Sequence, residues 1–306
     1  MQFRPNLARF RRVPPPEHPI DPTYAHDEYG ARDFMIERAF ADGPRALAGL
    51  SWNGAGPAGC VGIIHGLGDH ARRYGRAVHA LVDRGYAAEA LDLPGHGKSY
   101  GARGHVSSWE EYLEAVEAWW ERPRSGPAPI VLLGHSMGAL VALDFALRHP
   151  GRLRALVLSA PPFEVVLRAT MLKVRLAQLV VRVWPRFSQR TTILPSMLSH
   201  DPDVVRAHNA DPLVHYLMSA RLFFEFRSAN DRLRQSAGRI EIPTLVLHGD
   251  QDPISSPAGS EQWVRSAPPG RVESRRYPRL YHEILNEPEG VAIAEEVADW
   301  IRLKVS

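Results

Sequence analysis

The sequence of 306 residues lacks the features that define disulfide-bonded, transmembrane and nucleic-acid-binding proteins. It contains a single cysteine, Cys60, so no disulfide can form within the chain, and a reducing compartment fits this composition. It has no run of 18 or more apolar residues, which argues against a transmembrane helix. Lysine is nearly absent, and the many arginines of the chain form only short blocks among acidic residues. We therefore expect no extended basic surface that could bind the phosphates of a nucleic acid.

What the chain does have is the composition of a globular protein, with 44% hydrophobic and 23% charged residues and a formal net charge of +3. Residues 1–27 are basic and broken by prolines, and they lack the apolar core of a secretory signal. We expect them to form a tail on the body of the protein. The expected location is cytoplasmic, with the oligomeric state left open.

The hydrophobic pattern predicts an α/β fold, a mostly parallel central sheet flanked by helices. Apolar runs predict strands at 60–65, 86–91, 130–133, 153–159, 243–248 and 271–277. Helical periodicity predicts helices at 74–84, 109–120, 139–148, 259–266 and 291–303. Between residues 161 and 240 the pattern is helical and shows no convincing strand. The sequence therefore predicts one core, formed by residues 28–161 and 241–306, that is interrupted by a helical cap at 162–240.

The strongest chemical signal is Gly-x-Ser-x-Gly at Gly134, Ser136 and Gly138. It lies between an expected strand and an expected helix, which is the context of a nucleophile elbow. In such an elbow a sharp turn exposes the serine hydroxyl, and the glycines make room for the neighbouring backbones. The motif predicts Ser136 as a nucleophile.

A nucleophilic serine needs a base, and the base needs a carboxylate to orient it. After the expected strand at 243–248 come Asp250 and Asp252, and after the strand at 271–277 comes His282. This is the chain order serine, acid, histidine that the elbow requires. Asp252 is favoured over Asp250 because it lies further from the strand end and is better placed to reach the histidine.

The third requirement is a pair of backbone N–H groups that bind the developing oxyanion. One donor is expected from Met137, the residue that follows the nucleophile. The other is expected from Leu67, in the His-Gly-Leu-Gly loop after the first predicted strand. These residues complete the machinery for acyl transfer through an acyl-enzyme.

Five segments, HGLGDHARRY, DLPGHGKS, GHSMG, HGDQDP and YHEILNE, make the chain similar to the monoacylglycerol lipase and lysophospholipase branch of the α/β-hydrolases, the serine aminopeptidase S33 type. The resemblance covers nearly the whole chain after residue 33. It implies the α/β-hydrolase fold, the same catalytic residues and a lid over an acyl pocket. It further implies that Asp69 and Arg73 bind the head group. The chain departs from the branch at Asp69, where glutamate is common, and at Leu285, where some members have a histidine.

The cap opens with an apolar segment, 165–184, in which Arg168, Arg175 and Arg182 recur every seven residues. Two interpretations stay open for a helix of this kind. It can be buried in the body, or its outer side can meet a membrane or micelle surface while its inner side lines an acyl pocket. Apolar residues further along the cap favour an acyl chain as ligand.

We therefore expect a serine ester hydrolase that acts on lipid esters with one acyl chain and needs no metal or organic cofactor. A broad carboxylesterase or an acyltransferase on the same residues is the alternative. A remote alternative is dinucleotide binding, because residues 66–71 match G-x-G-x-x-A and Asp92 ends the next strand. Asp69 beside a pyrophosphate counts against it. His282-Glu283 does not continue into H-E-x-x-H, so the sequence predicts no zinc site.

Overall fold

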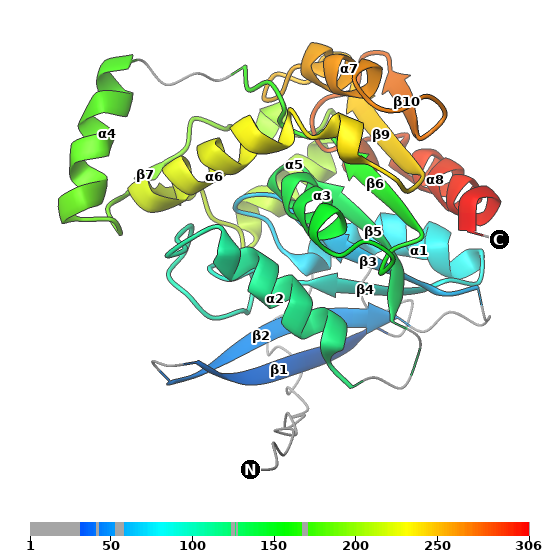
Figure 1. Cartoon of the computed structure of the whole chain (residues 1–306), viewed down its shortest axis with the longest axis horizontal. Coiled ribbons are helices and arrows are strands. Elements are labelled where there is room, and N and C mark those ends of the chain that lie inside the picture. Colours follow the sequence, from blue (N-terminus) through cyan, green and yellow to red (C-terminus); the bar gives the residue numbers. More distant parts are fainter. Residues whose placement is uncertain are drawn as a thin grey trace.

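The structure is a computed structural model that describes residues 31–40, 43–52, 58–123, 126, 128–166 and 171–305. The expected N-terminal tail, 1–27, lies outside the described residues, as does Arg168. Within the described part, helices surround a central sheet, and an arm of further helices projects from one side (Figure 1).

The central sheet has eight strands in the order β1-β2-β4-β3-β5-β6-β9-β10. Its strands are β1 (Arg32–Phe40), β2 (Gly43–Trp52), β3 (Cys60–Ile64), β4 (Ala87–Leu91), β5 (Pro129–His135), β6 (Ala155–Ser159), β9 (Thr244–Gly249) and β10 (Val272–Tyr277). In this order the six strands from β4 to β10 pair in parallel, whereas β2 runs antiparallel to both β1 and β4. The mostly parallel sheet is therefore confirmed. The antiparallel pair at its edge was not recognised in the sequence.

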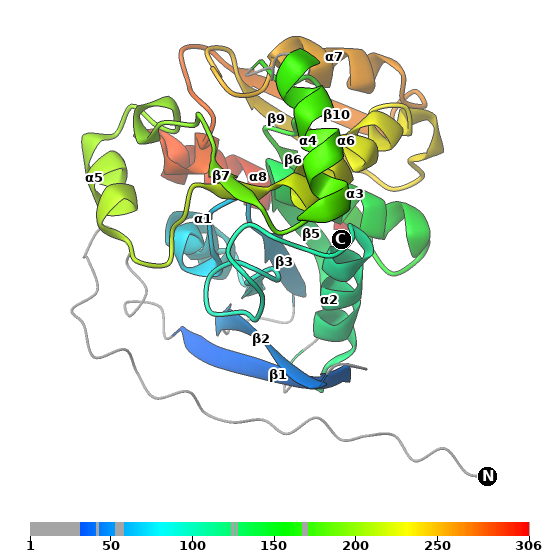
Figure 2. The same cartoon turned by 90° about the vertical axis from the view of Figure 1, so that its left-hand side faces the viewer.

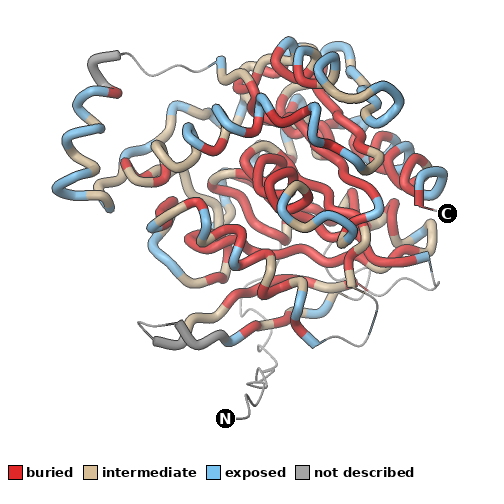
Figure 3. Tube along the Cα trace, in the orientation of Figure 1, coloured by how far each residue is buried: buried red, intermediate tan, exposed pale blue. Residues whose placement is uncertain are grey.

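Helices cover both faces of the sheet. On one face α1 (Gly75–Asp83) packs beside α8 (Gly290–Val305). On the other lie α2 (Glu110–Glu121), α3 (Met137–Arg148) and α7 (Pro257–Arg265). Within β5, Leu132 packs in the core under α3, whereas Val131 and Leu133 pack in the core under α1 and α8. The strand side chains thus alternate between two apolar cores, and the buried interior in Figure 3 follows this arrangement.

The segment between β6 and β9 holds α4 (Met171–Val183), β7 (Ser188–Arg190), η2 (Pro195–Met197), α5 (Pro202–Ala210), β8 (Leu217–Ser219), α6 (Ala220–Leu233) and η3 (Ala237–Arg239). It is mainly helical, but β7 and β8 form an antiparallel pair, so the expectation of no strand here was wrong. Each of these strands has only three residues, too few to show an alternating hydrophobic pattern. The cap boundaries at 162 and 240 stay a prediction.

Helix α4 stands apart from the rest of the chain in Figure 1, and Figure 2, viewed from that side, shows it in front of the other elements. Its side chains are largely exposed, with Leu179 61% and Val183 88% accessible, and Trp184 directly after it is 62% accessible. Only Val174 is buried among the side chains described on this helix. For the side chains described on this segment, the structure therefore contradicts burial in the body. None of the helices in the described residues is long and apolar enough to cross a membrane.

Candidate active site

Ser136 lies in the turn between β5 and α3, with φ 52° and ψ −121°. A positive φ is strained for a residue with a side chain, so the surrounding backbone must hold it. The Ser136 N–H donates to Ser159 O at 2.9 Å. A Cβ on Gly134 would lie 2.4 Å from Gly138 O, and one on Gly138 would lie 2.2 Å from Ile64 O. Both glycines are therefore needed for the strand, turn and helix to pack this closely.

His282 and Asp252 form a buried pair that joins the loops after β10 and β9. The Nδ1 atom of His282 lies 2.7 Å from Oδ2 of Asp252. The other oxygen of Asp252 accepts the N–H groups of Ile254 at 2.8 Å and Ser255 at 3.0 Å. Asp250, the alternative carboxylate, instead pairs with Arg276 near the surface. The structure thus brings Asp252, and not Asp250, to the histidine.

This contact sets the protonation of both partners. Burial alone would lower the pKa of His282, but the charge and hydrogen bond of Asp252 raise the pKa above its ordinary value. Burial would raise the pKa of Asp252, but His282 and a hydrogen bond from His248 hold that pKa far below its usual range. Asp252 therefore stays ionised at neutral pH and accepts the Nδ1–H of His282. This tautomer leaves Nε2 of His282 as a proton acceptor.

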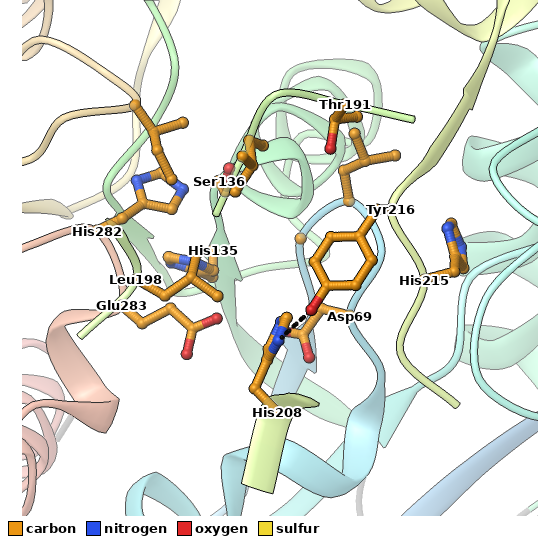
Figure 4. A pocket seen from close by; sticks show the side chains of 14 residues that line it. Asp69, His135, Ser136, Thr191, Leu198, His208, His215, Tyr216, His282 and Glu283 are labelled. Carbon is orange, nitrogen blue, oxygen red and sulfur yellow. Dashed lines mark hydrogen bonds between the residues drawn. The ribbon is translucent and has the colours of Figure 1, made fainter. Parts of the chain in front are cut away.

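Ser136 and His282 line the same pocket, in which the two side chains lie next to each other (Figure 4). The carboxyl ends of β3, β5 and β10 meet here, as expected for a site on a parallel sheet. The lining combines apolar and polar side chains from the core and from the segment between β6 and β9. Its residues are Gly66, Leu67, Asp69, His135, Ser136, Thr191, Ile193, Leu198, His208, His215, Tyr216, Ile254, His282 and Glu283.

The two expected oxyanion donors, Leu67 and Met137, belong to segments next to Ser136. Met137 opens α3, where N–H groups have no acceptor within the helix. Leu67 lines the pocket, and a Cβ on its neighbour Gly66 would lie 3.2 Å from Cβ of Ser136, so this loop touches the nucleophile. Within the described part of the chain, neither N–H donates a hydrogen bond. Both groups are free to bind an anion.

The two expected head-group residues have different positions. Asp69 lines the pocket, but Arg73, in the short helix η1 (Ala71–Tyr74), does not. The Arg73 guanidinium is buried and donates to both carboxylate oxygens of Glu283 at 2.7 Å and to Asp69 at 3.0 Å. Burial would raise the pKa of Glu283, but Arg73 holds that pKa well below its usual range. Arg73 thus keeps two carboxylates ionised beside the pocket without reaching it.

Sequence reasoning missed several polar residues of the pocket. Glu283 follows His282 directly, yet only the fold brings it to Arg73, 210 positions away. His208 and Tyr216 come from the segment after α4, and their side chains lie 3.1 Å apart (Figure 4). His215 lies beside Tyr216 in the sequence and also lines the pocket. Among fourteen histidines no local pattern distinguishes these two, so the sequence carried no usable signal for them.

In the loop after β4, Asp92 binds backbone groups, which argues against a role in dinucleotide binding. The Asp92 carboxylate accepts the N–H groups of Ala71 at 2.7 Å and Lys98 at 2.8 Å. It is 4% exposed and so does not face a ligand. Across the residues that the structure describes, no group of three or more histidine, cysteine or acidic side chains could hold a metal ion.

Comparisons with known proteins agree with the observed fold. Residues 55–289 match the family model described as serine aminopeptidase, S33. A monoacylglycerol lipase of Mycolicibacterium smegmatis is 32% identical over 251 residues, which cover 80% of this chain and 88% of that protein. Phospholipase YtpA of Bacillus subtilis is 28% identical, with 78% and 93% covered.

Among solved structures, the monoacylglycerol lipase of Paleococcus ferrophilus superposes with a TM-score of 0.76 at 31% identity, covering 85% of this chain and 99% of that one. A monoglyceride lipase variant of Saccharomyces cerevisiae, solved with a substrate analogue, has the same TM-score at 20% identity and covers 88% and 95%, which supports the fold. The chain therefore has the α/β-hydrolase fold and belongs to the serine aminopeptidase S33 family.

Proposed function

We propose that the protein is a serine carboxylic ester hydrolase that acts on lipid esters with a single acyl chain, such as monoacylglycerols. The observation that carries this proposal is the strained Ser136 in one pocket with a histidine whose Nδ1 is bound to a buried carboxylate. The names of the relatives, monoacylglycerol lipases above all, support the substrate class.

The reaction follows from the positions of these groups. The hydroxyl oxygen of Ser136 attacks the ester carbonyl carbon while Nε2 of His282 takes its proton. The N–H groups of Leu67 and Met137 bind the oxyanion, and Asp252 stabilises the imidazolium. Collapse expels the alcohol, which receives the proton from His282. Water then attacks the acyl-enzyme with the same assistance and releases the acid, so no cofactor is needed.

The pocket lining favours a ligand with one apolar and one hydroxyl-bearing part. Ile193, Leu198 and Ile254 offer an apolar wall for an acyl chain. Asp69 and Glu283 are acceptors that can bind hydroxyl groups of an alcohol. A glycerol head group fits this division of the lining. The relative named a phospholipase makes lysophospholipids the second class to test.

Helix α4 supports a further proposal, that the cap meets a lipid surface transiently. Its exposed leucines, together with Trp184, form an apolar surface, and Arg175 and Arg182 on the same helix are exposed as well. Apolar side chains beside arginines suit the boundary of a membrane or micelle. The cytoplasmic location stays a prediction.

The test is hydrolysis of a matched panel of esters by wild type and Ser136→Ala. The panel runs from short to long 4-nitrophenyl esters and then to glycerol, lysophosphatidylcholine and triacylglycerol esters of the preferred acid. The proposal expects a long-chain optimum, a preference for monoacylglycerol and loss of activity in the variant. A short-chain optimum indifferent to the alcohol indicates a broad carboxylesterase, and ester products formed with added alcohols indicate an acyltransferase. Activity that survives in Ser136→Ala contradicts the mechanism.

A further inference from the structure

A residue of the segment between α5 and β8, His215, touches the loop that carries Leu67. We call residues 65–69, which follow β3, the oxyanion loop. The backbone N–H of His215 donates to Gly68 O at 3.0 Å. A Cβ on Gly68, which has φ +76°, would lie 2.1 Å from His215 O. The two backbones are therefore in direct contact, and this approach requires the glycine.

The side chain of His215 fixes the backbone that makes this contact. Its Nε2 lies 3.1 Å from Gly95 O, and its Nδ1 lies 3.2 Å from the N–H of Leu217. A carbonyl can only accept, so Nε2 carries the hydrogen and Nδ1 accepts from Leu217. Burial, together with the charge of Arg103, lowers the pKa of His215 to about 4, so the neutral ring required for both bonds is present at pH 7.

A row of tilted rings in contact continues from His215 towards the start of the oxyanion loop. The His215 ring centroid lies 4.8 Å from that of His96, which lies 5.1 Å from that of His65. His65 is itself held between two backbone groups, the N–H of Leu93 at 2.9 Å and Gly66 O at 2.7 Å. The rings thus form a continuous packed support beneath the loop.

These contacts determine where the Leu67 N–H points. Gly66 O and the Leu67 N–H belong to one peptide unit, and in a planar trans peptide they point in opposite directions. The His65 ring holds Gly66 O on one side of the loop, which turns the Leu67 N–H to the other. One residue further on, Gly68 O is held by His215. Leu67 is therefore held on both sides. The His65 ring holds the carbonyl before it, and the backbone of His215, between α5 and β8, holds the carbonyl of the residue after it.

We propose that His215 is a positioning residue that holds the oxyanion loop in its anion-binding geometry. The inference rests on the proposed function, because it assigns His215 a part in the same reaction. It follows that the stretch bearing His215 stays docked during hydrolysis and that substrate enters by movement elsewhere, since withdrawal of His215 would release Gly68. Figure 4 shows His215 and His282 on opposite sides of Ser136, so His215 is not placed to act through His282.

The experiment compares His215→Ala and His215→Gln with a matched control, His105→Ala. His105 is buried and binds Ser219, at the start of α6, with its Nδ1 at 2.9 Å, so its loss removes a similar tether without touching the oxyanion loop. Removal of one oxyanion donor typically costs about 10²- to 10³-fold in kcat. A displaced donor should cost less, and we expect His215→Ala to lower kcat about 10- to 100-fold with KM changed by less than about threefold.

Two further readouts separate positioning from general support of the fold. The Gln variant can donate an amide N–H to Gly95 O and should recover most of the lost kcat. A boronic acid that mimics the tetrahedral intermediate should lose affinity by the factor by which kcat/KM falls, whereas a non-hydrolysable ether analogue of the substrate should not. His105→Ala should lower the Tm without these effects. If His215→Ala does not fold, His215→Asn, whose amide is too short to reach Gly95 O, takes its place.

The inference is overturned if the His215 variants keep wild-type kcat and boronic acid affinity while their Tm falls as in His105→Ala. It is equally overturned if His215→Gln is as impaired as His215→Ala. Failure of the proposed function looks different, because wild type itself would then show no ester hydrolysis that depends on Ser136.

Discussion

Replacing Asp252 with asparagine tests how the buried carboxylate acts on His282. One oxygen of the side chain accepts the N–H groups of Ile254 and Ser255, so the asparagine oxygen will keep that place. Its NH₂ group then faces His282 at the position where Oδ2 now lies 2.7 Å from Nδ1. Two donors cannot share this contact, and the ring must move its hydrogen to Nε2. In that tautomer His282 cannot accept the proton of Ser136.

The expected loss is about 10⁴-fold in kcat, the size seen when a serine protease histidine is held in the wrong tautomer. At about 1.36 kcal/mol for each factor of ten, this corresponds to roughly 5 kcal/mol of transition-state stabilisation. The pH dependence should change as well. Asp252 raises the pKa of His282, so in wild type kcat/KM falls on the acid side as His282 gains a proton. Without the carboxylate this fall should move to lower pH.

The assay is the pH profile of kcat/KM on a soluble ester, with Asp250→Asn as the matched control. Asp250 lies two positions away and pairs with Arg276 at the surface, so its variant should behave as wild type. A kcat of Asp252→Asn within about tenfold of wild type would contradict this role of Asp252, because it falls far short of the loss expected for a wrong tautomer. A move of the acid limb to higher pH would contradict this role too.

Three other substitutions have defined outcomes. Arg73→Met leaves two buried carboxylates unpaired and should lower the free energy of unfolding in urea by about 3–5 kcal/mol at pH 8. In wild type the lowered pKa of Glu283 stabilises the fold at pH values above the ordinary pKa of glutamate. In the variant the unpaired carboxyls gain protons as the pH falls, so the difference in unfolding free energy between wild type and variant should shrink at pH 5. Gly138→Ala sets a Cβ 2.2 Å from a backbone oxygen and should cost at least about 2 kcal/mol of stability in the same assay. Leu179→Gln, on the exposed face of α4, should slow hydrolysis of emulsified substrate several-fold but not that of a soluble ester, and equal effects on both would contradict interfacial contact.

The sequence was most informative where function depends on local geometry. The elbow at Ser136 needs a turn with glycines at fixed offsets, and that pattern can be read directly. The meeting of Asp252 and His282 could be predicted because parallel strands deliver their following loops to one edge of the sheet. The preference for Asp252 over Asp250 agrees with the observed contact. These positions come from chain order and strand ends, which the hydrophobic pattern reveals.

What the sequence could not reveal depends on contacts between distant segments. The pairing of Arg73 with Glu283 joins residues 210 positions apart, and nothing local in either segment indicates it. The exposure of α4 could not be decided from the sequence, because apolar composition is equally compatible with burial and with a surface that meets lipid. His215 has no motif at all, and its contact with Gly68 follows from how the stretch after α5 docks on the core.

In the proposed mechanism Ser136 is the residue acylated during catalysis. Reaction of the folded protein with a fluorophosphonate, followed by intact mass and peptide mapping, tests it most directly. We expect one adduct per chain, located on Ser136, absent from Ser136→Ala and formed far more slowly in His282→Ala. No adduct on the folded wild type, or an adduct on another residue, would contradict it.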